Sequence, residues 1–346
     1  MGSLLDHPSY RSFLAETHPR LHIDDDRLQG FPSFLAPLDV REPMVPGFVR
    51  RVLDGLRPVL PRLVTPPALF LGTPFERYDQ THLLDETGPI APFTERVRER
   101  ARALGQFAAV FTNLRPEALD PRAWRAHGWS ILPSFPDMVV PLSAPSFDDH
   151  VRTLPSGDRS GIRRNIRRFE RAGHGLDRIH DASGLGPALY RCYRPMYDRA
   201  TVRWQAHTEA YLAGLTRLGE AVDLVGAFTG DGQLIGFVVA FADGDGLQAG
   251  RIGVHPDFHR RDAVYFRLLY HTLEEALSTR GEGPGHLSLE PTGYRMKRHL
   301  GAERVPMVNL VLGVSATWRR LLGRFEGLGR RLLAHLTDRA ALERMY

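Results

Sequence analysis

The sequence predicts an α/β (α+β) protein in which mixed, mostly antiparallel sheets are flanked by helices. Apolar runs of strand length alternate with segments of helical periodicity along most of the 346 residues. Two Gly/Asp-rich turns, at 229–232 and 243–246, separate apolar runs in the second half, which is typical of antiparallel hairpins. Hydrophobic residues make up 42% and charged residues 25%, which excludes a disordered chain or a coiled-coil rod.

The first half alternates strands and helices behind a proline-rich start at 1–65. Residues 67–75 predict a buried strand that ends in a Gly-Thr-Pro turn. Residues 95–104 predict a helix, and 107–113 predict a second strand. The apolar, β-branched segment 128–142 is interrupted by prolines, so we expect strand pieces joined by a crossing.

Helices open the second half. Ser146 is followed by two acidic residues, the pattern of a capped helix start. A basic helix is expected over 159–173. A long helix is expected over 186–215, with a break at Pro195 because proline disturbs a helix interior.

The second half continues with a three-strand antiparallel meander within 222–256. Apolar residues at helical spacing then predict an amphipathic helix over 266–281, with Gly281 as its C-terminal stop. A strand at 286–290, a short helix at 292–302 and a final strand at 305–313 follow.

The C-terminal segment, 316–346, predicts a separate amphipathic helix with one apolar stripe and an arginine-rich opposite face. We expect this helix to pack on the domain or on a second subunit, which would give a homodimer. Docking to a membrane surface or to a carrier protein is the alternative.

Residue usage limits the function classes. The one cysteine, Cys192, cannot form an internal disulfide or a cysteine-rich zinc site, so we expect no metal. No run approaches the ~20 apolar residues of a membrane span, and the first residues lack a secretion signal, so we expect a cytoplasmic protein. Lys297 is the only lysine beside 44 arginines, and the net charge of +5 permits an anionic partner.

The order of elements from about 223 to 313 resembles the GNAT (Gcn5-related N-acetyltransferase) fold. In that family a meander strand ends in a V-x-P pattern, which Val254–Pro256 matches here. A phosphate-binding loop and helix follow, then a strand and a short helix ending in a glycine turn. Residues 300–302, Leu-Gly-Ala, stand at that position.

A narrower resemblance covers about 34–313. The chain is similar there to the FemAB-related, peptidoglycan-biosynthesis-like branch of GNAT proteins, which carries two GNAT-like halves. The motifs that carry this resemblance are PALFLGTPFERY, FTNL, GWSILPSFPDMVVPL, RSGIRRNIRRFERAG and HLSLEPTGYRMKRHLGA. This resemblance implies an N-terminal GNAT-like half at 1–145 and a catalytic C-terminal GNAT-like half at 146–315. The C-terminal helix at 316–346 follows them.

The resemblance implies an N-acyltransferase that moves an acyl group from a thioester to an amine of a small molecule or peptide, in specialised (natural-product) metabolism. The donor would be acyl-CoA or a phosphopantetheine-linked acyl group on an acyl carrier protein. One alternative is a Fem-like peptide-bond-forming transferase that uses aminoacyl-tRNA, a less favoured partner. The other is a non-catalytic binding module with the GNAT fold.

The strand that ends in V-x-P implies the acyl-binding site. Backbone N–H groups of Gly253 and Val254 would hold the carbonyl of the acyl group. Many GNAT proteins place a glutamate base on this strand, but Gln248 and Arg251 stand there instead, and Arg251 is a candidate substrate-binding residue. The adjacent His255 is a rival base, because imidazole changes charge near neutral pH.

The phosphate loop departs from the family pattern. We expect His259, Arg260 and Arg261 to contact the donor, with the two arginines acting as phosphate clamps. Asp262 and Val264 stand where the family has small residues that let backbone amides surround the CoA pyrophosphate. The alternative is an ordinary helix N-cap at Asp262.

The segment after 286–290 holds the main catalytic candidates. Glu290 could accept the proton of the amine, directly or through water. Tyr294 and Lys297 lie three residues apart on the next helix, and either could donate a proton or hydrogen bond to the leaving group. The alternatives are a helix cap at Glu290 and a solvated surface cation at Lys297.

Two further sets are candidate substrate contacts. Arg164 and Arg168 lie on the polar face of the basic helix 159–173, where like charges four residues apart favour an anionic partner; a solvated face is the alternative. Trp204 could line an acceptor pocket, or pack in the core.

Overall fold

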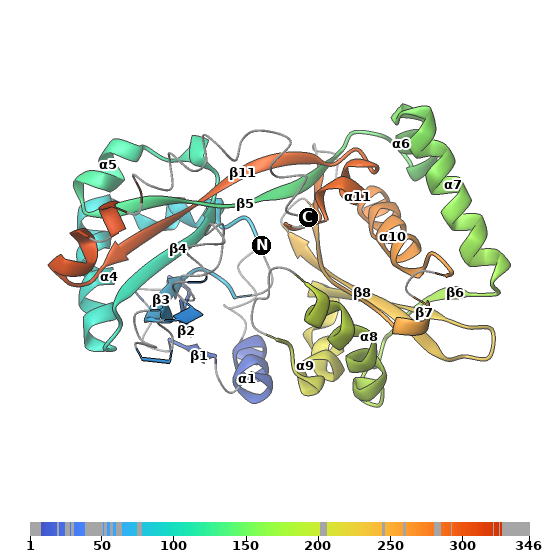
Figure 1. Ribbon diagram of the computed structural model, residues 1–346, viewed down its shortest axis with the longest axis horizontal. Helices are drawn as coiled ribbons and strands as arrows, with labels where there is room; N and C mark the ends of the chain where they lie inside the picture. The colour runs from blue at the N-terminus through green and yellow to red at the C-terminus, as the bar shows by residue number, and fades with distance from the viewer. Residues whose placement is uncertain are drawn as a thin grey trace. The chain divides into compact units, whose positions relative to one another are not determined.

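The chain divides into two compact units in the computed structural model (Figure 1). The first unit contains Asp137–Arg304 with Met1–His18 and Phe75–Arg77, and the second contains Pro19–Pro74, Tyr78–Pro136 and Val305–Tyr346. The predicted halves, 1–145 and 146–315, come from the family resemblance, and that division stays a prediction. The structure describes residues 8–18, 21–24, 28, 31–38, 51, 54–55, 58–59, 64–74, 78–200, 206–243, 246–258, 261–279, 285–291, 293–320, 322–324 and 326.

The first unit is built on a mixed sheet whose strand order is β5-β10-β9-β8-β7-β6. In the part of this sheet that the structure describes, neighbouring strands pair antiparallel, except that β9 and β10 pair parallel. The three-strand meander expected within 222–256 is present as β7, β8 and β9. The strands are β5 (Trp129–Leu142), β6 (Gly175–Arg178), β7 (Val222–Phe228), β8 (Leu234–Asp243), β9 (Gly246–Val254) and β10 (Gly285–Ser288).

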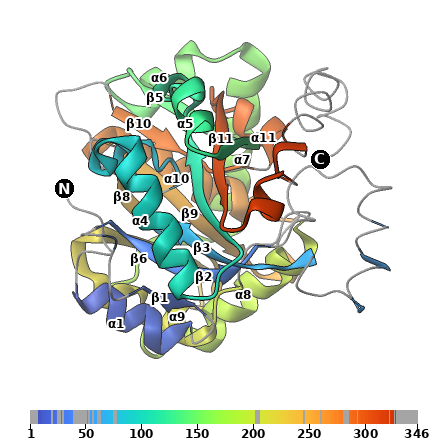
Figure 2. The ribbon, with the colours of Figure 1, turned by 90° about the vertical axis from the view of Figure 1, so that its left-hand side faces the viewer.

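Helices cover both faces of this sheet (Figure 1). On one face α7 and α10 enclose an apolar core, to which β8 and β9 contribute. On the other face lie α8 and α9, and α1 packs beside α9 (Figure 2). The helices are α1 (Pro8–Thr17), α6 (Phe147–Thr153), α7 (Ser156–Arg171), α8 (Gly186–Arg199), α9 (Glu209–Gly214), α10 (Val264–Thr279) and α11 (Tyr294–Arg298).

The second unit has the strand order β1-β2-β3-β4-β11-β5, with β3 and β4 parallel. Helix α4 lies over β3 and β4 (Figure 2). The core between them is rich in aromatic residues, which include Phe93, Phe111 and Trp129. The elements are β1 (His22–Ile23), β2 (Ser33–Pro37), β3 (Pro67–Leu71), α4 (Ile90–Ala103), β4 (Ala108–Leu114), α5 (Pro121–Ala126) and β11 (Glu303–Gly313).

Two local expectations based on proline are wrong. Residues 129–142 form the single strand β5, because the fixed φ of proline is compatible with extended backbone. Pro195 does not end α8, which continues to Arg199. Of the predicted helix 316–346, residues 316–320, 322–324 and 326 are helical, and the others lie outside the described residues.

Candidate active site

Strands β9 and β10 part after a short contact. Their parallel pairing reaches only Ser288↔Gln248, whereas β9 continues to Val254 with β8 as its neighbour on the other side. The amide of His255 donates to the carbonyl of Ile235, over a distance of 2.9 Å. Because strand amides alternate in direction, the N–H of Val254 is directed toward the β10 side, beyond the point where the pairing with β10 ends.

Gly253 has a packing role at the same place. Its amide alternates toward β8, where Gly253 is paired with Phe237. A Cβ atom at Gly253 would lie 2.3 Å from the Phe237 ring, closer than real contacts allow. Glycine therefore lets the aromatic ring cover the strand, and of the two predicted amides only that of Val254 faces away from β8.

Glu290 follows β10 and reaches across to β9. Its Oε1 accepts a hydrogen bond from Gln248 Nε2 at 2.8 Å, and its Oε2 pairs with Arg251 Nη1 at 2.6 Å. The side chain is 14% exposed, and burial raises the pKa of the carboxyl, an effect opposed by the charges of Arg251 and Lys297. The Glu290 carboxylate therefore lies against β9, the strand on which many GNAT proteins carry a glutamate base and this chain does not.

Lys297 holds the backbone that carries this carboxylate. Its Nζ donates to the carbonyl oxygens of Glu290 at 3.0 Å and Pro291 at 3.1 Å. Glu290 has a φ of 61°, in the left-handed region that a non-glycine residue rarely adopts. The two hydrogen bonds from Lys297 therefore hold the backbone in an unfavourable conformation. Lys297 is only 6% exposed and burial lowers its pKa to about 8, which excludes the solvated surface cation.

Asp137, on β5, is a member of the site that the sequence did not reveal. Its two carboxylate oxygens accept from Ser288 Oγ at 3.0 and 2.8 Å, and the side chain is 1% exposed. The Ser288 hydroxyl also accepts from the N–H of Glu290 at 3.3 Å. An acidic residue inside an otherwise apolar strand is the only sequence signal that could have indicated it.

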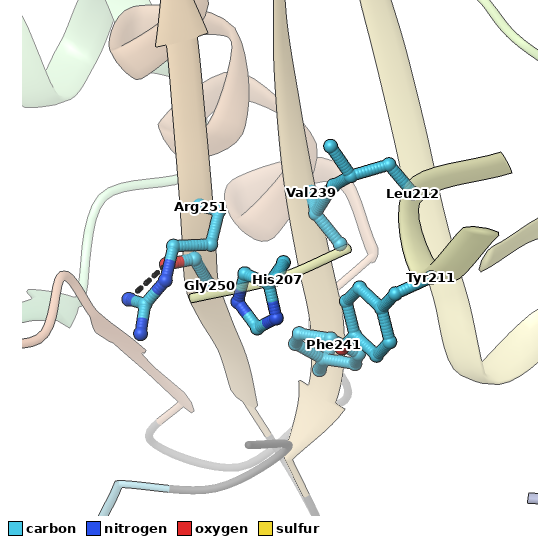
Figure 3. A pocket seen from close by; sticks show the side chains of 7 residues that line it. All are labelled: His207, Tyr211, Leu212, Val239, Phe241, Gly250 and Arg251. Carbon is cyan, nitrogen blue, oxygen red and sulfur yellow. Dashed lines mark hydrogen bonds between the residues drawn. The ribbon is translucent and has the colours of Figure 1, made fainter. Parts of the chain in front are cut away.

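A small pocket opens beside Arg251, on the α8/α9 face of the sheet (Figure 3). Its cavity of about 10 Å³ is at the lower limit for one water molecule. The lining residues come from α9 and the segment before it, from β8 and from β9: His207, Tyr211, Leu212, Val239, Phe241, Gly250 and Arg251. Because Arg251 also pairs with Glu290, the pocket lies next to the carboxylate.

The pocket carries a buried imidazole that sequence reasoning missed. The His207 ring stacks on Tyr211 with centroids 4.4 Å apart, and its backbone N–H donates to Tyr193 Oη at 3.0 Å. Burial lowers the pKa of His207 well below its ordinary value, with smaller effects from Arg251 and His18. His207 is therefore neutral at physiological pH, and a neutral imidazole has one ring nitrogen that can accept a hydrogen bond.

Tyr294 and His255 lie outside the contacts around Glu290. Tyr294 is buried, and the guanidinium of Arg304 lies 5.1 Å from its ring centroid. His255 is partly exposed beside the end of β9. Its Nδ1 accepts from the N–H of Asp257 at 3.4 Å, and its ring packs against Phe258.

Three predicted contacts fall on residues whose structure is not described. The donor contacts His259 and Arg260, and the acceptor-pocket candidate Trp204, lie outside the described residues. The Arg261 side chain is 77% exposed. Asp262 is buried immediately before α10, and its carboxylate contacts His174 and Arg261.

The basic helix has the two faces that its sequence predicts. Ile162 and Phe169 of α7 are buried, whereas Arg164 and Arg168 are exposed. The exposed face can meet an anionic partner or water, so both interpretations of these arginines stay open.

Neither metal nor membrane features are found in the part of the chain that the structure describes. No group of three or more His, Cys, Asp or Glu side chains there could hold a metal ion. Within the same residues, no helix has both the length and the apolarity that a membrane crossing needs.

Residues 156–288 match a family model described as an acetyltransferase (GNAT) domain. No curated protein matches the chain.

Similar solved structures cover nearly the whole chain. FemX has a TM-score of 0.57 at 11% identity, over 93% of this chain and 95% of its own. L-PGS from Bacillus licheniformis has 0.53 at 11% identity, over 92% and 97%. The C-terminal domain of a putative lysylphosphatidylglycerol synthetase from Agrobacterium fabrum has 0.53 at 12%, over 89% and 88%. This likeness in fold confirms the predicted fold class. The domain match over 156–288 confirms the resemblance to GNAT proteins and the acyltransferase class.

Proposed function

We propose that the protein is an N-acyltransferase that passes an acyl group from a thioester directly to an amine. The proposal is supported by the match of residues 156–288 to the model of an acetyltransferase (GNAT) domain. The acceptor is a small molecule or a peptide in the specialised metabolism of the cytoplasm. The observation that carries the proposal is the Glu290 carboxylate, held by Gln248 and Arg251 where β9 and β10 part.

Glu290 acts as the general base. A neutral amine attacks the acyl carbon with its free lone pair, and the nitrogen must then lose one proton to become the nitrogen of an amide. The raised pKa of Glu290 makes its carboxylate a better proton acceptor than an ordinary surface carboxylate. The new C–N bond forms, the C–S bond breaks, and the proton taken by Glu290 is returned to the departing sulfur.

The backbone of β9 supplies the second requirement. As the nitrogen attacks, negative charge develops on the carbonyl oxygen of the acyl group, and a fixed N–H donor stabilises it. The amide of Val254 has the required direction, away from β8. We assign Lys297 to the positioning of Glu290 through its backbone carbonyl. Tyr294 remains a candidate proton donor, and His255 remains the alternative base.

Transfer is direct, without an acyl-enzyme intermediate on sulfur. Cys192 is fully buried, and burial raises the pKa of its thiol to about 12. A thiol needs its ionised form to act as a nucleophile, so Cys192 is inert at physiological pH.

The test is the release of free thiol from an acetyl thioester in the presence of amines. Glu290→Gln keeps the size of the side chain but cannot accept a proton, so we expect kcat to fall by about 100-fold or more. Glu303→Gln, which alters an exposed glutamate on β11, is the matched control. Unchanged turnover in Glu290→Gln excludes this base.

A second candidate is a transferase that takes its acyl group from aminoacyl-tRNA. It is supported by the likeness to FemX and to lysylphosphatidylglycerol synthetase, which are aminoacyl-transferases. Activity that is lost on ribonuclease treatment and that does not respond to added thioesters would favour this candidate over the first.

A further inference from the structure

The start of α10 is where a GNAT-like chain would hold the pyrophosphate of CoA. The first N–H groups of a helix have no partner within the helix, and together with the helix dipole they attract anions. Here Asp262 lies two residues before the first residue of α10, and its side chain is only 8% exposed. A carboxylate of the protein thus lies beside the position that a phosphate would take.

The Asp262 carboxylate is fixed in place by its neighbours. His174 Nε2 lies 3.2 Å from Asp262 Oδ2, and Arg261 Nε donates to Oδ1 at 3.4 Å. The His174 ring is itself buried between two aromatic rings, with centroids 5.5 Å from Phe169 and 5.7 Å from Phe258. The Asp262 carboxylate is therefore buried and held in one position, unlike the side chain of an exposed aspartate.

The next residue also opposes a pyrophosphate. Ala263 has a φ of 58°, a conformation that glycine adopts more readily, yet it carries a methyl group there. Val264, the first residue of α10, is fully buried in the core. The described part of the loop thus lacks the bare backbone that lets several amides approach one anion.

We propose that the donor site accepts a pantetheine thioester without the nucleotide of CoA, with Asp262 excluding the pyrophosphate. This inference rests on the proposed acyl transfer to an amine. The acyl carbon and the pantetheine arm reach the end of β9 as in the reaction above, and nothing binds at the start of α10. A free pantetheine thioester and the prosthetic group of a carrier protein share this chemistry.

Affinity for two unacylated ligands tests the exclusion without any turnover. In calorimetric titrations of the full chain, we expect pantetheine to bind at least as tightly as CoA. Asp262→Gly and the milder Asp262→Asn should tighten CoA binding by about tenfold or more, and leave pantetheine unchanged. Glu170→Gln removes an exposed carboxylate from α7 and controls for net charge.

Three results overturn the inference. The first is wild-type protein that binds CoA tenfold more tightly than pantetheine. The second is a pair of folded Asp262 variants with the CoA affinity of wild type. The third is a chain that binds neither ligand, before or after substitution, which would favour the aminoacyl-tRNA candidate.

Turnover separates the two sources of the donor. Acetyl-pantetheine, an acetylated small acidic carrier protein and acetyl-CoA are compared by kcat/KM with the same amine. Preference for the carrier protein identifies a protein-borne donor, equal rates with free acetyl-pantetheine identify the free one, and a tenfold preference for acetyl-CoA contradicts the proposal. Ligand affinities that follow the prediction in a protein that acylates no amine would refute the proposed function and leave the exclusion of the nucleotide standing.

Discussion

Replacing Lys297 by methionine separates the stability of the site from its activity. The substitution keeps the length of the side chain and removes the two hydrogen bonds from Nζ to the carbonyls of Glu290 and Pro291. Without them, the left-handed conformation of Glu290 loses the contact that holds it, so we expect the carboxylate to be held less firmly against Gln248 and Arg251.

The stability effect is a difference between two opposing quantities. Burial lowers the pKa of Lys297 from 10.5 to about 8, so holding it charged at neutral pH costs about 3 kcal/mol at ~1.4 kcal/mol for each pH unit. Each hydrogen bond from a charged donor contributes about 1.5–3 kcal/mol. The cost of the buried charge and the gain from the two hydrogen bonds nearly cancel. We therefore expect Lys297→Met to lower the free energy of unfolding by only about 1–2 kcal/mol.

The pH dependence of the free energy of unfolding provides a second, independent test of the buried Lys297. Between about pH 8 and pH 10.5, Lys297 is neutral in the folded protein and protonated in the unfolded chain. The unfolded state binds more protons in that window, so the contribution of Lys297 to the free energy of unfolding rises with pH. Denaturant titrations should show this rise in wild type and not in Lys297→Met.

Activity should respond far more strongly than stability. We expect kcat for thiol release to fall by about 100-fold, equivalent to ~2.7 kcal/mol of transition-state stabilisation. The positive charge of Lys297 favours ionised Glu290, so its removal raises the pKa of that carboxyl and moves the acid limb of kcat/KM to higher pH. Arg295→Met, at an exposed position of the same helix, is the control. A Lys297→Met protein with normal turnover and an unmoved acid limb refutes the reasoning.

Two further substitutions test neighbouring parts of the site. Arg251→Met removes the opposite charge 2.6 Å from the Glu290 carboxylate, so the pKa of Glu290 should rise further and the acid limb of kcat/KM should move to higher pH; an acid limb that stays in place contradicts this. Gly253→Ala places a methyl group 2.3 Å from the Phe237 ring, and we expect a loss of about 1–3 kcal/mol in the free energy of unfolding. Chemical denaturation measures that loss, and unchanged stability would show that the ring can move aside.

The sequence predicts the local elements around the site because their signals are short-range. Two Gly/Asp turns define the meander, and spacing of apolar residues defines α10. Glu290 is identifiable from its place at a strand end. Lys297 is identifiable because it is the only lysine of an arginine-rich chain.

The partners of these residues could not be predicted, because they depend on long-range register. Asp137 and Ser288 are 151 residues apart in sequence and meet only because β5 pairs antiparallel with β10. His207 enters the pocket through packing against Tyr211 rather than through any motif. The expected break at Pro195 failed for a related reason, since tertiary packing can retain a helix that local preference would end.

The most direct test of the mechanism is the ionisation of Glu290 itself. Selective ¹³C labelling of glutamate carboxyls allows its titration to be followed by NMR, and the signal that disappears in Glu290→Gln assigns it. We predict a midpoint above the ordinary glutamate value of 4.5, coincident with the acid limb of kcat/KM. A midpoint at or below 4.5, or an acid limb that does not follow it, contradicts the role of Glu290 as the base.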